Sequence, residues 1–379
     1  MTRYRIPFNK PTFTGNESRY IAEALERGQL SGDGPFSKRC HALLESSLGV
    51  HKALLTTNCT HALEMSAFLL DLQPGDEVIV PSFAFVTSAN AYAVRGAKPV
   101  FVDVRPDTLN LDERLVERAI TPRTKAILAL HYAGIGCEMD ALLALAKKRG
   151  LALVEDNAHG LYGKYKGRYL GTLGGLATQS FHETKNFTCG EGGALLVNDA
   201  RLAERAEIIR EKGTNRSRFL RGEVHKYTWV DLGSSYLPSD VLAAFLLAQL
   251  EAREQIQSRR GALWQRYASE LAGWAREFGV TLPGVPAGCE PSWHLFYMLL
   301  PQSALRERFL DHLAQRGILG VFHYLPLHVS DMGRRYGGKE GDCPVTEDSS
   351  ARLVRLPLFH SLTDSEQTEV IEAVASFRV

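Results

Sequence analysis

Short β-like runs alternate with helical runs from about residue 50 to 200, and this alternation limits the possible folds more than any other feature. The β runs include "KALL", "DEVIVPSF", "PVFVDV", "KAILALHY" and "LALVED". They are short, continuous and rich in branched residues, as expected for strands buried on both faces. Helical runs such as "THALEMSAFLLDL" and "MDALLALAKKRG" follow them. The pattern predicts an α/β fold, with a mostly parallel sheet flanked by helices.

The chain of 379 residues is longer than a single hydrophobic core normally supports. A long amphipathic helix is expected from about residue 239, in "SDVLAAFLLAQLEAREQIQSRRGALWQRYASEL", and less regular α and β segments follow it. We therefore predict a large domain over residues 1–250 and a smaller α+β domain over residues 251–379.

Charge and cysteine spacing exclude several classes of function. A net charge of +1 gives no general attraction to nucleic acid or to anionic lipid. The six cysteines include no CxxC pair, which argues against a disulfide framework and a zinc site and favours reduced thiols in the cytoplasm. We expect no metal. The N-terminal "MTRYRIPFNKPTF" has no apolar h-region, and "VLAAFLLAQL" is too short to cross a membrane.

Ligands of a parallel sheet bind beyond the carboxyl ends of its strands, so residues directly after the β runs are the first candidates. In "TTNCTHAL", Cys59 and Thr60 begin a helix, whose free N–H groups and dipole favour a phosphate. Capping of that helix by Asn58 or Thr60 is the plainer alternative. In "PSFAFVTSAN", Phe83 is expected in the core, whereas Phe85 could present a flat face to a planar ligand.

The run "LALVEDNAHG" ends in two carboxylates, Glu155 and Asp156. Neighbouring strand residues point to opposite faces of the sheet. A carboxylate that is poorly solvated there needs a cationic partner, and a protonated ring nitrogen would serve. A helix cap or an ion pair with an arginine is the alternative.

Lys185 lies within "SFHETKNFTCGEGG", between a strand-like run and three glycines. Glycines allow close approach of the backbone to a ligand, and a lysine in such a site can lose its proton and bind an aldehyde. An ordinary exposed lysine is the alternative. An anion site, a flat aromatic ring, a carboxylate for a ring nitrogen and this lysine together match the needs of pyridoxal 5′-phosphate.

The motifs "SFHETKNFTCGEGG", "VEDNAHG", "PSFAFVTSANA" and "HYLPLH" resemble those of the DegT/DnrJ/StrS sugar-nucleotide aminotransferases, and the similarity covers essentially the whole chain. The resemblance implies a fold type I enzyme that uses pyridoxal phosphate, with its site at a homodimer interface. Lys185 would bind the cofactor and move protons, and Asp156 would pair with the ring nitrogen. The other implied cofactor contacts are Phe85 on the ring, His159 near the ring hydroxyl, and Cys59, Thr60 and Ser180 at the phosphate. Ser235 of "GSSYL" stands where the family often has a phosphate-binding asparagine from the partner.

The stretches "SFHETKN", "IIREKGTNRS", "KYTW" and "LGSSYL" are similar to one subgroup of this family. That subgroup uses L-glutamate to aminate C4 of dTDP-4-keto-6-deoxyglucose, for enterobacterial common antigen. Substrate contacts suggested by position are Asn9, Arg216, Arg218, Lys226 and His328, for which surface charge or loop structure is the alternative. Three other functions stay open: a C3-keto or UDP-linked substrate, a dehydratase, against which Lys185 argues, and a non-catalytic regulator that binds the cofactor. A dehydrogenase lacks its glycine fingerprint.

Overall fold

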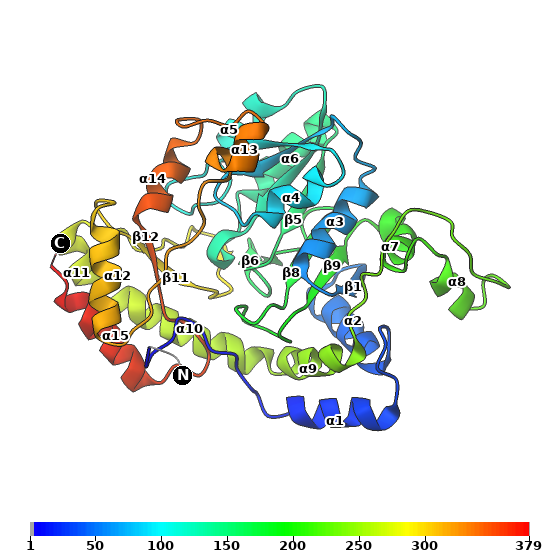
Figure 1. Cartoon of the computed structure of the whole chain (residues 1–379), viewed down its shortest axis with the longest axis horizontal. Coiled ribbons are helices and arrows are strands. Elements are labelled where there is room, and N and C mark those ends of the chain that lie inside the picture. Colours follow the sequence, from blue (N-terminus) through cyan, green and yellow to red (C-terminus); the bar gives the residue numbers. More distant parts are fainter. Residues whose placement is uncertain (1–3, 379) are drawn as a thin grey trace.

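The computed structural model describes residues 4–378, and its centre is a seven-stranded sheet in the order β1-β9-β8-β5-β4-β2-β3 (Figure 1). Strand β9 is antiparallel to both of its neighbours, and all other pairs in the sheet are parallel. The strands are β1 (Lys52–Thr56), β2 (Glu77–Pro81), β3 (Lys98–Val102), β4 (Thr124–Leu130), β5 (Ala152–Asp156), β8 (Leu176–Ser180) and β9 (Gly193–Val197). The predicted α/β fold with a mostly parallel sheet is confirmed.

Helices cover both faces of this sheet. In β2, Val78 and Val80 pack with α3, α4 and α7, whereas Ile79 between them packs with α5 and α6 on the other face, as the alternation of strand side chains requires. Helices α2 and α9 cover that second face beneath β1, β8 and β9. The helices are α1 (Glu17–Arg27), α2 (Pro35–Leu48), α3 (Cys59–Leu69), α4 (Thr87–Ala93), α5 (Glu113–Ala119), η1 (Tyr132–Gly134), α6 (Met139–Arg149), η2 (Ala200–Leu202), α7 (Ala203–Arg210), α8 (Arg216–Leu220) and α9 (Asp240–Glu251).

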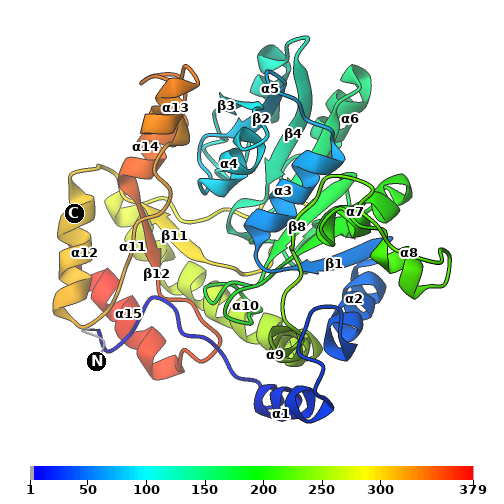
Figure 2. The ribbon, with the colours of Figure 1, turned by 45° about the vertical axis from the view of Figure 1, so that its right-hand side comes forward.

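A second, smaller unit is built around one antiparallel pair of strands, β11 and β12 (Figure 2). Phe296 and Met298 of β11 and Val354 of β12 enter a core that α10, α11, α12 and α15 enclose. The elements of the C-terminal part are α10 (Arg253–Glu270), α11 (Ala272–Phe278), β10 (Cys289–Glu290), β11 (Phe296–Leu299), α12 (Leu305–Gln315), η3 (Leu327–Val329), α13 (Asp331–Arg335), α14 (Pro344–Arg352), β12 (Leu353–Leu356) and α15 (Asp364–Ser376). Strand β10 joins the short hairpin β6 (Lys164–Tyr165) and β7 (Arg168–Tyr169).

The N-terminal segment lies against the small unit rather than against the large sheet. Ile6 is fully buried in the small core, its backbone pairs with Ile318, and the Arg5 guanidinium pairs with Glu369. The division at residue 250 remains a prediction, and these contacts show that Arg5 and Ile6 pack with the C-terminal part.

The expected long helix after residue 239 is two helices. Helix α9 ends at Glu251, and Ala252 has ψ 16°, outside the helical range, before α10 begins at Arg253. The two segments have different surroundings, since α9 is buried along most of its length against α1 and α2, whereas α10 contributes Leu263 and Tyr267 to the small core. The prediction of one continuous helix was therefore wrong.

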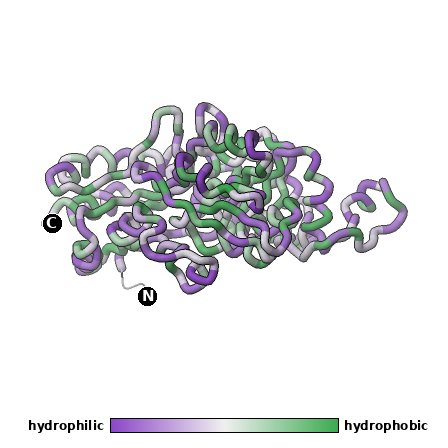
Figure 3. The backbone as a smooth tube through the Cα atoms, turned by 90° about the horizontal axis from the view of Figure 1, so that it is seen from above, coloured by the Kyte–Doolittle hydropathy of each residue, from purple (hydrophilic) through white to green (hydrophobic). Residues whose placement is uncertain are grey.

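A loop that contains α8 stands away from the rest of the molecule (Figures 1 and 3). Several of its large apolar side chains are exposed, with Trp229 at 74% and Leu220 at 66%. Across residues 4–378, no helix combines the length and the apolar character needed to cross a membrane.

Candidate active site

Lys185 lies in the loop between β8 and β9, close to the carboxyl end of the parallel strands. Backbone bonds close this loop, from Lys185 N to the His182 carbonyl at 2.9 Å and from Glu183 N to the Gly190 carbonyl at 2.8 Å. Gly190 has φ +84°, and a Cβ on Gly192 would lie 2.5 Å from Cys189 Sγ. The glycines therefore allow the tight return into β9 that the sequence suggested.

The Lys185 amine is prepared for a reaction with an electrophile. Burial lowers its pKa to about 8, and the nearby Cys59 and Asp156 oppose that shift. No hydrogen bond or ion pair to its Nζ occurs within residues 4–378. An amine with a lowered pKa is neutral, and nucleophilic, in a useful fraction of molecules near neutral pH.

Asp156 is the last residue of β5 and is 3% exposed. Its Oδ2 accepts from Ser88 Oγ at 2.7 Å, and its Oδ1 accepts from Ala158 N at 3.2 Å. Burial raises its pKa, an effect that these hydrogen bonds and Lys185 partly oppose. No ion pair to Asp156 occurs in the described chain, so its carboxylate lacks the direct cationic partner that a buried charge requires.

The start of α3 forms an anion site of backbone N–H groups. Asn58 caps the helix by accepting from His61 N at 2.8 Å, so the capping alternative holds for Asn58. The next two N–H groups, of Cys59 and Thr60, have no intrahelical acceptor because they belong to the first turn. A Cβ on Gly193 would overlap the Asn58 carbonyl group and lie 2.5 Å from Cys59 N. Glycine thus lets β9 pass directly beside the helix start.

Ser180 pairs with Gly193 in the β8–β9 register and is half-buried, which puts it next to the same helix start. Cys59 is tied to β8 as well, since its Sγ contacts Thr178 Oγ1 at 3.5 Å. Burial raises the Cys59 pKa to about 12, so the side chain is a neutral thiol.

The rings of Phe85 and His159 are the two predicted aromatic contacts of the cofactor. Phe85 follows β2 and is 54% exposed, whereas Phe83 is fully buried, as predicted. His159 is buried, and its Nε2 lies 3.1 Å from Tyr324 Oη. Its Nδ1 is buried and has no partner in residues 4–378. Burial lowers the His159 pKa well below its usual value, so the imidazole is neutral and, if Tyr324 donates to Nε2, carries its proton at Nδ1.

These residues fit pyridoxal 5′-phosphate on features of the protein itself. Asp156 lacks a cation, which a pyridinium nitrogen would supply; Nδ1 of His159 lacks an acceptor, which a ring hydroxyl would supply. The residues that would hold the group are Lys185 at the aldehyde, Asp156 at the ring nitrogen, His159 at the ring hydroxyl, Phe85 on the ring, and Cys59, Thr60 and Ser180 at the phosphate.

Asn9 is the predicted substrate residue that lies beside this loop, because its Nδ2 donates to the Glu183 carbonyl at 3.0 Å. His328 is fully buried, with Nδ1 2.6 Å from Ser82 Oγ and Nε2 2.9 Å from Glu347. Both of its ring nitrogens are occupied, so a substrate would have to displace one of these partners.

The remaining predicted residues belong to the loop around α8 that stands away from the body. Arg216 bonds with Glu211 at 3.4 Å, Arg218 pairs with Glu204 and Glu223, and Lys226 is exposed. Ser235, at the base of this loop, is exposed, and its backbone forms an antiparallel β-bridge with Glu211. None of them contacts the cofactor residues of its own chain.

Three polar side chains around the site were not predicted. Ser88 binds Asp156, Tyr324 binds His159, and His294 stacks on His159 with ring centroids 4.3 Å apart. Ser88 is the second residue of α4, three residues after Phe85, and its place just after a strand end is a signal that could have found it. Tyr324 lies within "HYLPLH", so the family motif could have pointed to it, whereas His294 has no such signal in the sequence.

Comparison with known proteins agrees with this geometry. The model of the DegT/DnrJ/EryC1/StrS aminotransferase family matches residues 11–375. The spore coat polysaccharide biosynthesis protein SpsC of Bacillus subtilis is 32% identical over 377 residues, which cover 97% of this chain and 96% of SpsC.

Solved structures are similar over almost the whole chain. The aminotransferase TlmJ of Streptoalloteichus hindustanus has a TM-score of 0.89 at 33% identity, with 99% of this chain and 98% of TlmJ covered. Spr1654 of Streptococcus pneumoniae, in its PLP form, has a TM-score of 0.91 at 28% identity, with 98% of each chain covered. With the lysine, the carboxylate and the anion site in place, the chain belongs to the DegT/DnrJ/EryC1/StrS family and is a sugar aminotransferase that depends on pyridoxal 5′-phosphate.

Proposed function

We propose that this enzyme transfers the amino group of L-glutamate to C4 of dTDP-4-keto-6-deoxy-D-glucose, and so forms dTDP-4-amino-4,6-dideoxy-D-galactose and 2-oxoglutarate. The observation that carries the reaction class is the Lys185 amine, whose pKa is lowered to about 8, in one site with Asp156. The choice of sugar rests on the resemblance of "SFHETKN", "IIREKGTNRS" and "LGSSYL" to one subgroup of the family.

Pyridoxal 5′-phosphate, when bound, supplies an electron sink for the carbon that exchanges its proton. In our proposal, Asp156 keeps the ring nitrogen protonated, because its buried carboxylate is stabilised by a positive charge. The N–H groups of Cys59 and Thr60, with Ser180, hold the phosphate at the helix start. Phe85 covers the ring, and His159 donates from Nδ1 to the ring hydroxyl.

Lys185 has two tasks in this proposal. Its amine holds the cofactor aldehyde between turnovers, and during turnover it moves a proton at the substrate carbon that gains or loses the amino group. Because the lysine approaches from one side only, the face of C4 that receives the proton sets the configuration of the product.

We also propose that the enzyme is a cytoplasmic homodimer whose subunits complete each other's sites. The support is the loop around α8, which stands away from its own body and exposes Trp229 and Leu220. In such a dimer, Ser235, Arg216 and Lys226 would meet the partner's cofactor phosphate or nucleotide sugar, while Asn9 and His328 would act in their own subunit. Native mass spectrometry that finds a monomer at micromolar concentration would refute the dimer.

The test of substrate is to incubate the purified holoenzyme with L-glutamate and a panel of dTDP- and UDP-linked 3-keto and 4-keto sugars. The expected result is turnover of dTDP-4-keto-6-deoxyglucose, with the amino group at C4 in the galacto configuration by NMR of the product. Amination at C3, or of a UDP sugar alone, would replace the proposed substrate by one of the alternatives.

A Lys185→Ala variant is the control for the chemistry. We expect it to bind the cofactor but to lose turnover, and substantial activity in it would contradict the role of Lys185. A wild-type protein that takes up the cofactor and aminates no sugar of the panel would favour the non-catalytic alternative.

A further inference from the structure

Arg355 of β12 has hydrogen-bond donors that the protein does not use. Its Nε and Nη2 donate to the Phe322 carbonyl at 3.2 and 2.9 Å, and its guanidinium lies 4.6 Å from the centre of the Phe8 ring. A guanidinium carries five N–H donors, so three of them have no acceptor within residues 4–378, and two of these three form the Nη1–Nη2 edge. No carboxylate of the described chain forms an ion pair with it.

The two segments that contact Arg355 both continue into the candidate site, one to His159 and the other to the loop of Lys185. Phe322 is followed by His323 and Tyr324, and Tyr324 binds His159. Phe8 is followed by Asn9, which donates to the carbonyl of Glu183 in the lysine loop. The charge of Arg355 also acts in the site, since it adds to the effect of burial in lowering the pKa of Lys185.

Nearby arginines of the same part of the chain differ from Arg355 in this respect. Arg352, three residues earlier, pairs with Asp348 and donates to the Leu300 carbonyl, and Arg306 pairs with Glu307. An unpaired, half-buried guanidinium with one open edge is suited to an anion that presents two oxygens.

We propose that Arg355 binds an anionic group of the substrate held beside Lys185, by donating from its open edge to two oxygens. The inference rests on the proposed aminotransferase function and deepens it, because it names a residue that positions the substrate. Two groups have the required chemistry, a carboxylate of the amino donor and a phosphate of the nucleotide sugar. Both substrates use the same site in turn, so the arginine can serve either or both.

The test measures binding to the holoenzyme by isothermal titration calorimetry, with probes that cannot react. Glutarate is a dicarboxylate without an amino group, and dTDP is a diphosphate without a keto sugar. Arg355→Gln removes the charge and the pair of parallel N–H donors. We expect it to lower the affinity for one or both probes by about 10- to 100-fold, the range for a hydrogen bond to a charged group. Arg355→Lys keeps the charge but loses the paired donors, so we expect an intermediate loss of affinity for the same probe.

The pattern identifies the source of the anion. Weaker glutarate binding alone assigns Arg355 to the amino donor, weaker dTDP binding alone assigns it to the nucleotide sugar, and weakening of both assigns it to both. Unchanged affinity for both probes in either folded variant would overturn the proposal.

Arg352→Gln is the matched control, since it removes a paired arginine close by and is expected to leave both affinities unchanged. Thermal unfolding of each variant separates loss of binding from loss of structure, and Arg355→Lys decides the matter if Arg355→Gln does not fold. Failure of the proposed function would look different, because the wild-type enzyme itself would then aminate no sugar.

Discussion

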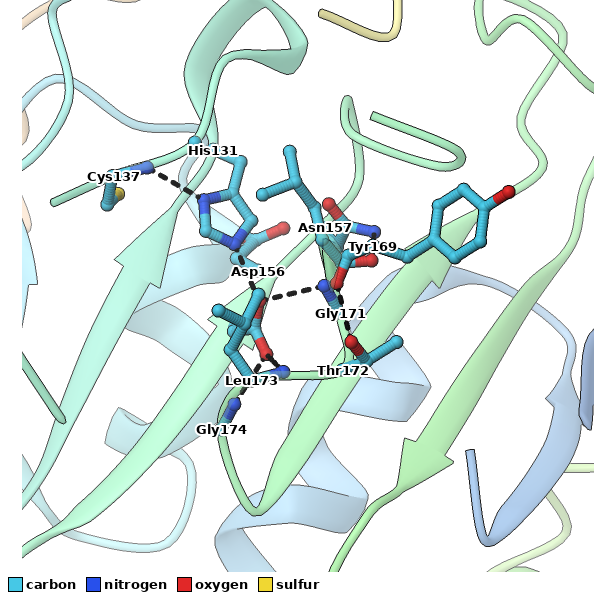
Figure 4. A network of polar contacts seen from close by, with 12 residues as sticks. His131, Cys137, Asp156, Asn157, Tyr169, Gly171, Thr172, Leu173 and Gly174 are labelled. Carbon is cyan, nitrogen blue, oxygen red and sulfur yellow. Dashed lines mark hydrogen bonds and ion pairs between the residues drawn. The ribbon is translucent and has the colours of Figure 1, made fainter. Parts of the chain in front are cut away.

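Glu155 and Asp156 are neighbours at the end of β5, and both are buried, but the protein completes the surroundings of only one of them. Glu155 accepts from Gly171, Leu173 and Gly174 N at 2.6 to 2.8 Å and pairs with His131 Nε2 at 2.8 Å. Figure 4 shows these donors converging at the strand end, with His131 held in turn by Cys137 N.

Asp156 points to the other face and receives a hydroxyl and one backbone N–H, with no cation. Glu155 has four donors within the protein and contributes to the fold, whereas Asp156, with two donors and no cation, is available to a cationic ligand. Two acidic residues one position apart thus have two roles, and burial alone does not distinguish them. The four predictions below test this difference.

The largest effect should come from Asp156→Asn, which keeps the shape and removes the charge. We expect turnover to fall by about 10³-fold, the scale for losing a preorganised electrostatic contact, because the ring nitrogen would no longer be kept protonated. The protein without cofactor should be at least as stable as the wild type, since an unpaired buried charge is gone. Steady-state kinetics and thermal unfolding measure the two effects, and an active Asp156→Asn enzyme would remove the basis of the comparison.

Glu155→Gln should act on stability first. We expect the free energy of unfolding to fall by about 3 kcal/mol, because His131 and three backbone N–H groups lose a charged acceptor in the core. Urea denaturation measures this change, with Glu117→Gln as control. Glu117 pairs with Lys148 and Arg149 at the surface, where such pairs contribute about 1 kcal/mol or less. Equal losses in the two variants would show that the Glu155 network is not special.

Ser88→Ala should reduce kcat/KM by about tenfold, as expected for one hydrogen bond to a charged group. The Ser88 hydroxyl lowers the Asp156 pKa against the effect of burial, so without it the carboxylate is less firmly ionised. Ser66→Ala is the matched control, since Ser66 is also buried but bonds to Leu63 and Tyr92. Identical kinetics for both variants would leave Ser88 without a role at Asp156.

The smallest effect is a shift in a pH profile. Lys185 reacts as the neutral amine, so its capture of pyridoxal 5′-phosphate, trapped with borohydride and followed by mass spectrometry, should rise with pH around a midpoint near 8. The Asp156 carboxylate raises the Lys185 pKa, so Asp156→Asn should move the midpoint to lower pH. Glu155→Gln should leave it in place, and equal shifts in both would mean that the two carboxylates affect the lysine alike.

Much of the large domain could be predicted from local sequence. The β runs were found because parallel strands buried on both faces are continuously apolar. Lys185, Asp156 and Thr60 were chosen as candidates because such strands bring their carboxyl ends together, and their roles stay predictions. The break at Ala252 could not be predicted, since alanine is a strong helix former and the break accompanies a change of neighbours between two units.

The side chains that the C-terminal part contributes to the site were harder to predict. Tyr324, His294 and Arg355 come from the C-terminal part, where strands are short and contacts depend on how that part meets the sheet. Their residue types fit a core, a loop or a surface equally well. Only the fold shows that Tyr324 reaches His159 and that Arg355 has an open edge.

The contacts of residues 4–9 matter for shortened versions of this enzyme. Ile6 fills the small core and Asn9 holds a carbonyl two residues before Lys185, so a few amino acids at the start of the chain join the C-terminal unit to the reacting lysine. Trimming into residues 4–9 would remove a core side chain and a loop anchor together. Because Asn9 is also a proposed substrate contact, a loss of activity after such trimming would combine a loosened lysine loop with a lost contact.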